Sequence, residues 1–177
     1  KDETYRNLLT DDVIDRMENA APLHDVGKII VSDTILLKPG KLTEEEFEKM
    51  KIHTSAGEEL IAKLFRNMND TEFLQTAKDI AVYHHERWDG KGYPKGLSQD
   101  AIPLCARIMA IADVYDALIS VRVYKPAIDP EKALEIIMSE SGTHFDPDII
   151  RVINDIKDEL ADIANISGTD ENSHNKT

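Results

Sequence analysis

Apolar residues recur every three to four positions along most of the chain, which is the period of a helix with one buried face. This pattern predicts six helices, at about residues 10–21, 43–64, 71–86, 103–120, 129–142 and 146–163. The apolar runs Ile29–Val31 and Ile35–Leu37 could form short strands, but Lys38-Pro39-Gly40 breaks the pattern. We therefore expect a buried loop from Ile29 to Gly40.

Residues with capping chemistry stand where the helical periods begin. Thr43-Glu44-Glu45-Glu46 is a capping box, in which threonine and glutamate side chains satisfy free backbone N–H groups. Asp129-Pro130 and Asp146-Pro147 each combine an N-cap aspartate with a proline that fits the first helical position. Pro22 is expected to kink or restart the first helix.

The composition is that of a globular protein. We expect residues 1–166 of the 177 to form one domain and the polar residues 167–177 to be a disordered tail. No apolar run approaches the roughly 20 residues that cross a membrane. Cys105 is the single cysteine, so no internal disulfide can form, which fits the cytoplasm. The net charge of −13 disfavours nucleic acid, and an anionic substrate would need a local positive pocket.

Ligand-type side chains are concentrated between Leu23 and Lys28. Here a histidine directly precedes an aspartate, and a lysine follows the histidine by four residues. On a helix, His24 and Lys28 would share a face. Imidazole and carboxylate groups suit a divalent metal, and an ammonium suits a phosphate. This stretch is therefore the first candidate for a reactive site.

Other ligand-type residues fall on inward helix faces. By itself His53 is best interpreted as a satisfied core histidine, and His84 and His85 could simply favour a helix C-terminus. Asp113 lies among apolar residues, where a carboxylate is costly unless it is paired or binds a metal. The combined set supplies enough ligands for a two-metal site, with the aspartate of the first pair as bridge: His24, Asp25, His53, His84, His85 and Asp113.

Two further features could contact a ligand. Asp89–Gly96 holds three glycines and a proline and is predicted to be a loop. Its Tyr93 could offer a stacking or gating surface, or it could pack the loop down. Arg122 and Lys125 place two cations just beyond the fourth helix, although solvated surface residues would give the same pattern.

These motifs together resemble the HD-GYP family, a subgroup of the HD-domain metal-dependent phosphohydrolases. The resemblance covers about residues 10–155 and rests on these segments: His24-Asp25-x-Gly27-Lys28, His53-Thr54, His84-His85-Glu86, Asp89-Gly90-x-Gly92-Tyr93-Pro94 and Ile111-Ala112-Asp113. It implies an all-α helical bundle with a metal centre between the helices. It also implies hydrolysis of cyclic di-GMP to linear pGpG and sometimes on to GMP, in bacterial second-messenger signalling.

The resemblance assigns roles to particular residues. The two or three divalent metals, most often iron or manganese, would be held by the six histidines and aspartates named above. Asp25 and Lys28 would be catalytic, and Lys28 would contact the phosphate. Tyr93, Arg122 and Lys125 would hold the dinucleotide. The loop around Gly92, Tyr93 and Pro94 could also bind a diguanylate cyclase domain.

One departure from the family pattern bears on activity. HD domains usually carry another histidine on an upstream helix, but no histidine precedes His24. We therefore expect the chain to begin after the first helix of the domain, with fewer ligands for a third metal. The alternative function is a non-catalytic module that senses a cyclic dinucleotide or binds a partner. A purely structural helical domain would leave Asp113 and the paired histidines unexplained.

Overall fold

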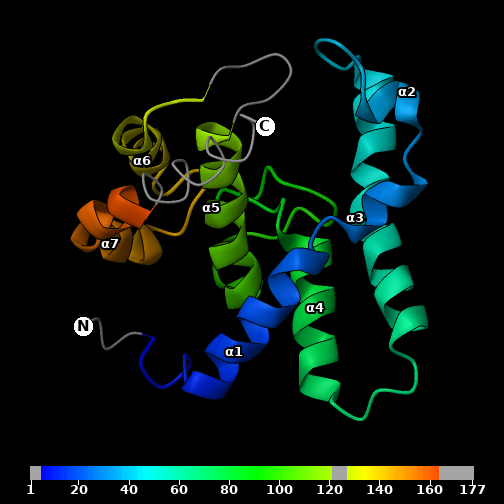
Figure 1. Cartoon of the computed structure of the whole chain (residues 1–177), viewed down its shortest axis with the longest axis horizontal. Coiled ribbons are helices and arrows are strands. Elements are labelled where there is room, and N and C mark those ends of the chain that lie inside the picture. The colour runs from blue at the N-terminus through cyan, green and yellow to red at the C-terminus, as the bar shows by residue number, and fades with distance from the viewer. Residues whose placement is uncertain (1–4, 121–126, 164–177) are drawn as a thin grey trace, which may run out of the picture. The chain divides into compact units, whose positions relative to one another are not determined.

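The computed structural model describes residues 5–120 and 127–163, and the chain divides into two units, residues 1–110 and 111–177. Within the described ranges there is no strand, only one isolated bridge between Ser141 and Phe145. The all-α prediction is confirmed for this part of the chain (Figure 1). Its elements are α1 (Asp11–Ala20), η1 (Ala21–Leu23), η2 (Val26–Ile30), α2 (Asp33–Leu36), α3 (Glu44–Leu64), α4 (Thr71–Tyr83), η3 (Gln99–Ala101), α5 (Leu104–Ile119), α6 (Pro130–Ser139) and α7 (Pro147–Asp155).

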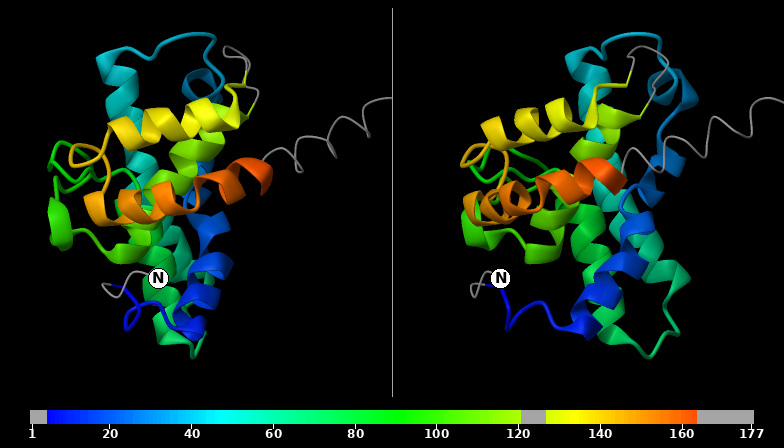
Figure 2. Two further views of the ribbon diagram at one scale, coloured as in Figure 1. Left: turned by 90° about the vertical axis from the view of Figure 1, so that its left-hand side faces the viewer. Right: turned by 60° about the vertical axis from the view of Figure 1, so that its left-hand side comes forward.

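In the first unit, α3 packs against α4 and η2, and α1 packs against α4 (Figures 1 and 2). Their shared core consists of small and β-branched side chains: Ala20, Ile61, Ala77, Ile80 and Ala81. Three of these five residues are alanines, so the helices can approach closely. The packing places α4 beside η1 and α3.

The predicted helix starts are confirmed. The Thr43 hydroxyl accepts the Glu46 backbone N–H, and the Glu46 carboxylate accepts the Thr43 N–H, which completes the capping box. The first helix ends at Ala20, and Pro22 lies in the 3-10 turn η1 that follows. Local sequence chemistry therefore sets these boundaries.

A glycine lets η2 lie directly on α3. A Cβ added to Gly27 would stand 1.9 Å from the His53 carbonyl oxygen and 2.5 Å from the Gly57 nitrogen. No side chain fits such a gap, so only glycine permits this approach of one backbone to the other. The contact ties the His24-Asp25 turn to the middle of α3.

The predicted buried loop at residues 29–40 was wrong. The segment forms the end of η2 and the short helix α2, capped by Ser32. Its apolar side chains are mostly exposed, with Ile29 at 79% and Leu37 at 69% exposure. On α3, the apolar residues Phe47 and Leu64 near its two ends are exposed, although the helical period of apolar positions extends to both. The helix extends beyond the core on both sides.

The second unit contains α6 and α7, which pack against each other. Asp129 and Asp146 cap these helices through backbone N–H groups, and a proline follows each, as predicted. α6 ends at Ser139, earlier than expected, and a turn at Ile156 separates α7 from the helical residues 157–163. The predicted tail, 167–177, lies outside the described residues. No helix in the described ranges is both long and apolar enough to span a membrane.

Candidate metal centre

The His24-Asp25 pair lies in a turn between η1 and η2. Because the backbone is 3-10 here, His24 and Lys28 do not share a helical face as predicted. Instead, the Lys28 ammonium donates a short hydrogen bond to Asp25 Oδ2, three residues away. The hydrogen bond holds the Lys28 ammonium against the Asp25 carboxylate.

The other histidines come from α3 and from the end of α4. His53 lies in the middle of α3 and is 1% exposed. α4 ends at Tyr83, three residues earlier than predicted, so His84 caps the helix and His85 lies in the turn after it. Leaving the helix there lets consecutive histidines face one centre, which consecutive helical residues could not do.

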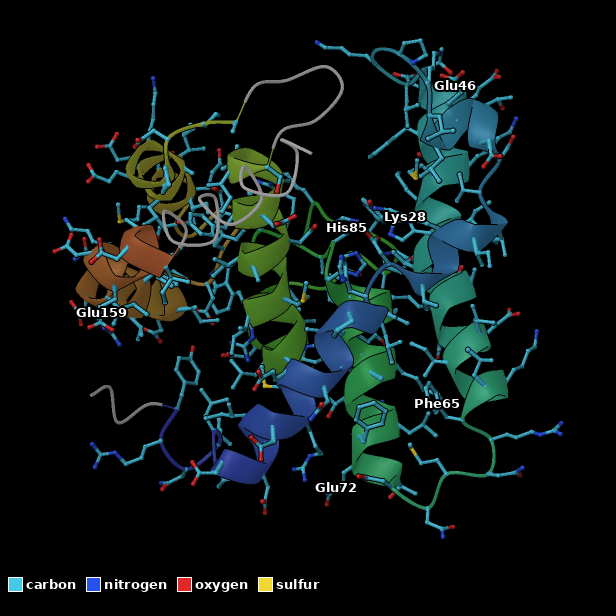
Figure 3. The ribbon with its side chains drawn as sticks, in the orientation of Figure 1. Lys28, Glu46, Phe65, Glu72, His85 and Glu159 are labelled. Carbon is cyan, nitrogen blue, oxygen red and sulfur yellow. The ribbon has the colours of Figure 1, made fainter. Side chains whose placement is uncertain are left out.

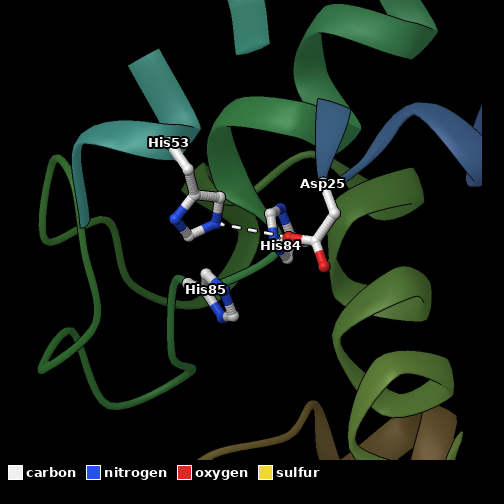
Figure 4. A group of neighbouring side chains, drawn as sticks. All are labelled: Asp25, His53, His84 and His85. Atoms are coloured by element: carbon white, nitrogen blue, oxygen red, sulfur yellow. Dashed lines mark ion pairs between the residues drawn. The ribbon is translucent and has the colours of Figure 1, made fainter. Parts of the chain in front are cut away.

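Four side chains converge on one point (Figure 4). Asp25, His53, His84 and His85 each offer a ligand atom, and these four atoms lie within 4.8 Å of one another. Asp25 Oδ1 is 3.5 Å from His53 Nε2 and 3.8 Å from His84 Nε2. These separations are longer than hydrogen bonds and leave room for an ion between the atoms.

His24 approaches the other carboxylate oxygen. Its Nε2 lies 3.2 Å from Asp25 Oδ2, and its ring meets the His84 ring edge-on at 5.3 Å. Asp25 therefore presents one oxygen to His53 and His84 and the other to His24. A carboxylate in this position can bridge two ions.

Backbone carbonyls orient three of the rings. The Nδ1 atoms of His24, His53 and His84 lie 2.8, 2.6 and 2.9 Å from the carbonyl oxygens of Ala21, Met50 and Ile80. A neutral ring that donates from Nδ1 carries its lone pair on Nε2, which here faces the centre. Metal-binding histidines in proteins are usually oriented by such a hydrogen bond.

Burial keeps the imidazoles of His53, His84 and His85 neutral. It lowers the pKa of His84 to about 4 and that of His85 to about 2, and it also lowers the pKa of His53. Burial alone would raise the pKa of the Asp25 carboxyl, but the His24 ring and the Lys28 ammonium beside it outweigh burial. The pKa of Asp25 therefore lies well below its usual range. Neutral imidazoles and an ionised carboxylate are the forms that bind metals.

Three buried polar atoms at the centre have no hydrogen-bond partner: Asp25 Oδ1, His53 Nε2 and His84 Nε2. An unsatisfied buried polar atom costs about 1–3 kcal/mol. All three face the same point, so a single divalent cation would satisfy them together. The donor set therefore fits a transition metal.

The remaining predicted site residues are placed differently. The ring of Tyr93 lies 4.8 Å from that of His85. Asp113 belongs to the part of α5 in the second unit, and its role as a ligand stays a prediction. Arg122 and Lys125 lie outside the described residues. Figure 3 labels Lys28 on η2 and His85 in the turn after α4.

Sequence reasoning gave no role to Glu86. This residue is 2% exposed, and both of its carboxylate oxygens accept backbone N–H groups. The available signal was its position directly after two histidines and before a glycine-rich loop. A glutamate at a helix end is usually solvated, so the pattern alone did not mark it.

Comparison with known proteins decides the family. A family model described as HD domain matches residues 4–149. The chain belongs to the HD-domain family. The predicted resemblance to HD-domain phosphohydrolases is thereby confirmed.

Several relatives of this HD domain have named activities. A Vibrio cholerae protein named cyclic di-GMP phosphodiesterase is 51% identical over 90% of this chain and 32% of its own length. A Thermotoga maritima protein with the same name is 41% identical over 92% of this chain and 43% of its own length. The 3'3'-cGAMP-specific phosphodiesterase 2 of V. cholerae is 43% identical over 86% of this chain and 28% of its own length. The chain thus spans less than half the length of these relatives.

A solved structure shares the fold. The crystal structure of a cyclic GMP-AMP-specific phosphodiesterase of V. cholerae superposes with a TM-score of 0.52 at 22% identity. The match covers 84% of this chain and 39% of the other. At this identity the likeness concerns the helical architecture alone.

Proposed function

We propose that this HD domain is a metal-dependent phosphodiesterase that hydrolyses cyclic di-GMP to linear pGpG. The observation that carries the proposal is the set of three buried, unpartnered ligand atoms that face one point beside Lys28. The names of the relatives support a cyclic dinucleotide as substrate. The proposed function thus rests on two observations: ligand atoms placed to bind a metal ion, and membership of the HD-domain family.

The residues suit a centre of two metal ions with Asp25 as the bridge. One ion would be held by Asp25 with the imidazoles of His53, His84 and His85. The second would be held by Asp25 with His24, and we include Asp113 in the ligand set. Mixed imidazole and carboxylate ligands suit iron or manganese. A third ion would need ligands beyond these six residues.

The chain's own residues would bind and orient the substrate. When bound, the metal ions would supply positive charge to a phosphoryl oxygen and help activate the attacking water. Lys28 adds a cation beside Asp25 and can donate to a phosphate oxygen. Tyr93 offers an aromatic face beside His85 on which a base could stack. In a protein of net charge −13, such local positive charge is what an anionic dinucleotide requires.

We expect about two metal ions per chain after incubation with Mn²⁺ or, without oxygen, with Fe²⁺. The reason is that Asp25 presents its two oxygens to two separate sets of imidazole nitrogens. Elemental analysis after gel filtration measures the ratio. His144→Ala is the matched control, because this histidine stacks on Phe145 in the second unit. A preparation that takes up no metal would contradict the proposal.

With metal bound, cyclic di-GMP should be hydrolysed with a kcat/KM at least about tenfold above that of 3'3'-cGAMP, a difference of roughly 1.4 kcal/mol in transition-state binding. Chromatography of pGpG and GMP release measures both the rate and the end product. A higher kcat/KM for 3'3'-cGAMP than for cyclic di-GMP would show that 3'3'-cGAMP is the preferred substrate. Tight binding without turnover would favour the non-catalytic sensing module.

The predicted cytoplasmic location and diguanylate cyclase partner stay predictions.

A further inference from the structure

Glu86 is a buried carboxylate outside the candidate metal centre. It follows His84 and His85 directly and is 2% exposed. Its Oε1 accepts the Lys95 backbone N–H at 2.6 Å, and its Oε2 accepts the Leu97 N–H at 3.0 Å. Both oxygens are thus used by the loop that contains Tyr93. Hydrogen bonds to a carboxylate are stronger than those between neutral groups.

The same short segment also supports the start of this loop. Tyr93 donates its backbone N–H to the His85 carbonyl oxygen at 3.2 Å. A Cβ added to Gly92 would stand 2.4 Å from the Arg87 nitrogen and 2.5 Å from Glu86 Cα. The loop backbone therefore lies directly on residues 85–87. The Glu86 side chain then fixes the far side of the turn.

The Tyr93 ring is held between a candidate ligand and α3. It lies 4.8 Å from the His85 ring, inclined by 32°, and 6.5 Å from the His53 ring. It also meets Phe47 edge-on at 5.9 Å, and the Lys51 ammonium lies 5.5 Å from its centroid. The position of this ring depends on where the loop backbone is held.

We propose that Glu86 is a positioning residue that fixes the Gly92–Leu97 loop, and with it the Tyr93 ring, against the histidines of the metal centre. The proposal rests on the proposed function where it concerns the substrate. Consecutive residues thereby do two jobs: His84 and His85 face the metals, and Glu86 places the aromatic surface next to them. The affinity for the dinucleotide then depends on a residue that does not touch it.

Glutamine tests this role with little change in shape. A carboxylate accepts from both backbone N–H groups, whereas an amide accepts through its oxygen and points an NH₂ group at the other N–H. Glu86→Gln thus removes one of the two contacts. We expect the KM for cyclic di-GMP to rise about tenfold, as for one lost hydrogen bond to a charged group. kcat should stay within about twofold and metal content should not change.

Asp70→Asn is the matched control. Asp70 caps the opposite end of the same helix and accepts the Phe73 N–H at 2.9 Å. Asparagine caps a helix as well as aspartate, so KM should not move. An unchanged KM in Glu86→Gln would overturn the proposal. A fall in metal content that parallels the loss of activity would also overturn it, because it would show a general loss of structure.

A double variant tests whether Glu86 acts through the tyrosine. In a Tyr93→Ala background, Glu86→Gln should raise KM by less than about twofold, since coupled residues are not additive. An equal effect in both backgrounds would overturn the proposal.

Trp88 gives a readout that needs no substrate. It is the only tryptophan, and its carbonyl accepts the Gln99 N–H at 3.1 Å across the loop. Acrylamide quenching of its fluorescence should increase in Glu86→Gln and not in Asp70→Asn, and unchanged quenching would overturn the proposal. If the unmodified protein neither binds nor hydrolyses cyclic di-GMP, the proposed function fails, and quenching alone decides the role of Glu86.

Discussion

Asp25→Asn is expected to lower the rate of cyclic di-GMP hydrolysis by at least about a thousandfold and to remove most of the bound metal. Replacing a residue that only hydrogen-bonds to a metal ligand typically lowers metal affinity or activity about 10–100-fold. Asp25 is placed as a direct ligand, so a larger loss is expected. Its Oδ1 faces His53 and His84, and its Oδ2 faces His24. Elemental analysis and a hydrolysis assay with excess Mn²⁺ measure both effects.

Asp79→Asn is the control for this variant. Asp79 is a partly buried carboxylate on α4 that accepts a hydrogen bond from Gln75, and it is not part of the candidate centre. Its replacement should leave metal content and rate within about twofold. Asp25→Ala should also lose more metal than His53→Ala, because Asp25 faces His24 with one oxygen and the other histidines with its second oxygen. Equal losses would show that Asp25 does not bridge.

Gly27→Ala should destabilise the protein by at least about 3 kcal/mol, the upper end of the usual cost of overpacking. The added methyl would stand 1.9 Å from the His53 carbonyl oxygen, so η2 must move away from α3. Such a movement displaces Asp25 and Lys28 from the α3 histidine. Urea denaturation measures the free energy of unfolding, and metal titration measures the loss of metal affinity that the displacement of Asp25 should cause.

Gly57→Ala is the matched control, since Gly57 lies across the same contact. Its added methyl would meet the Ala81 side chain at 3.3 Å, a small adjustment. Alanine also gains about 0.5–1 kcal/mol over glycine inside a helix. The free energy of unfolding should therefore change by less than about 1 kcal/mol. Similar losses in both variants would show that the Gly27 contact is not specific.

Local chemistry in the sequence determined the helix starts. The Thr43 capping box and the Asp-Pro pairs at 129 and 146 act within one turn of backbone, so no distant residue is needed to interpret them. Helix ends were less predictable. α4 ended three residues early, because the direction that the chain takes after Tyr83 depends on where the next loop packs.

The sequence also identified the candidate ligands. Histidines and an aspartate in apolar stripes are costly unless they are satisfied, so His53, His84 and His85 stood out by position. Their residue types indicated a metal, and the order of motifs indicated the HD family. The exposed Ile29, Ile30 and Leu37 show the limit of this reasoning, since an apolar run alone does not reveal whether another element covers it.

Only the tertiary structure decided how the candidate ligands face one another. The sequence placed His24 and Lys28 on one helical face, whereas a 3-10 turn places Lys28 against Asp25 and lets each carboxylate oxygen face different imidazoles. The contact of Gly27 with α3 joins distant residues, and Glu86 accepts backbone N–H groups from beyond its own turn, 9 and 11 residues along the chain. The spacing of motifs specifies which groups are available. Their distances depend on how separate backbone segments pack, which no local pattern encodes.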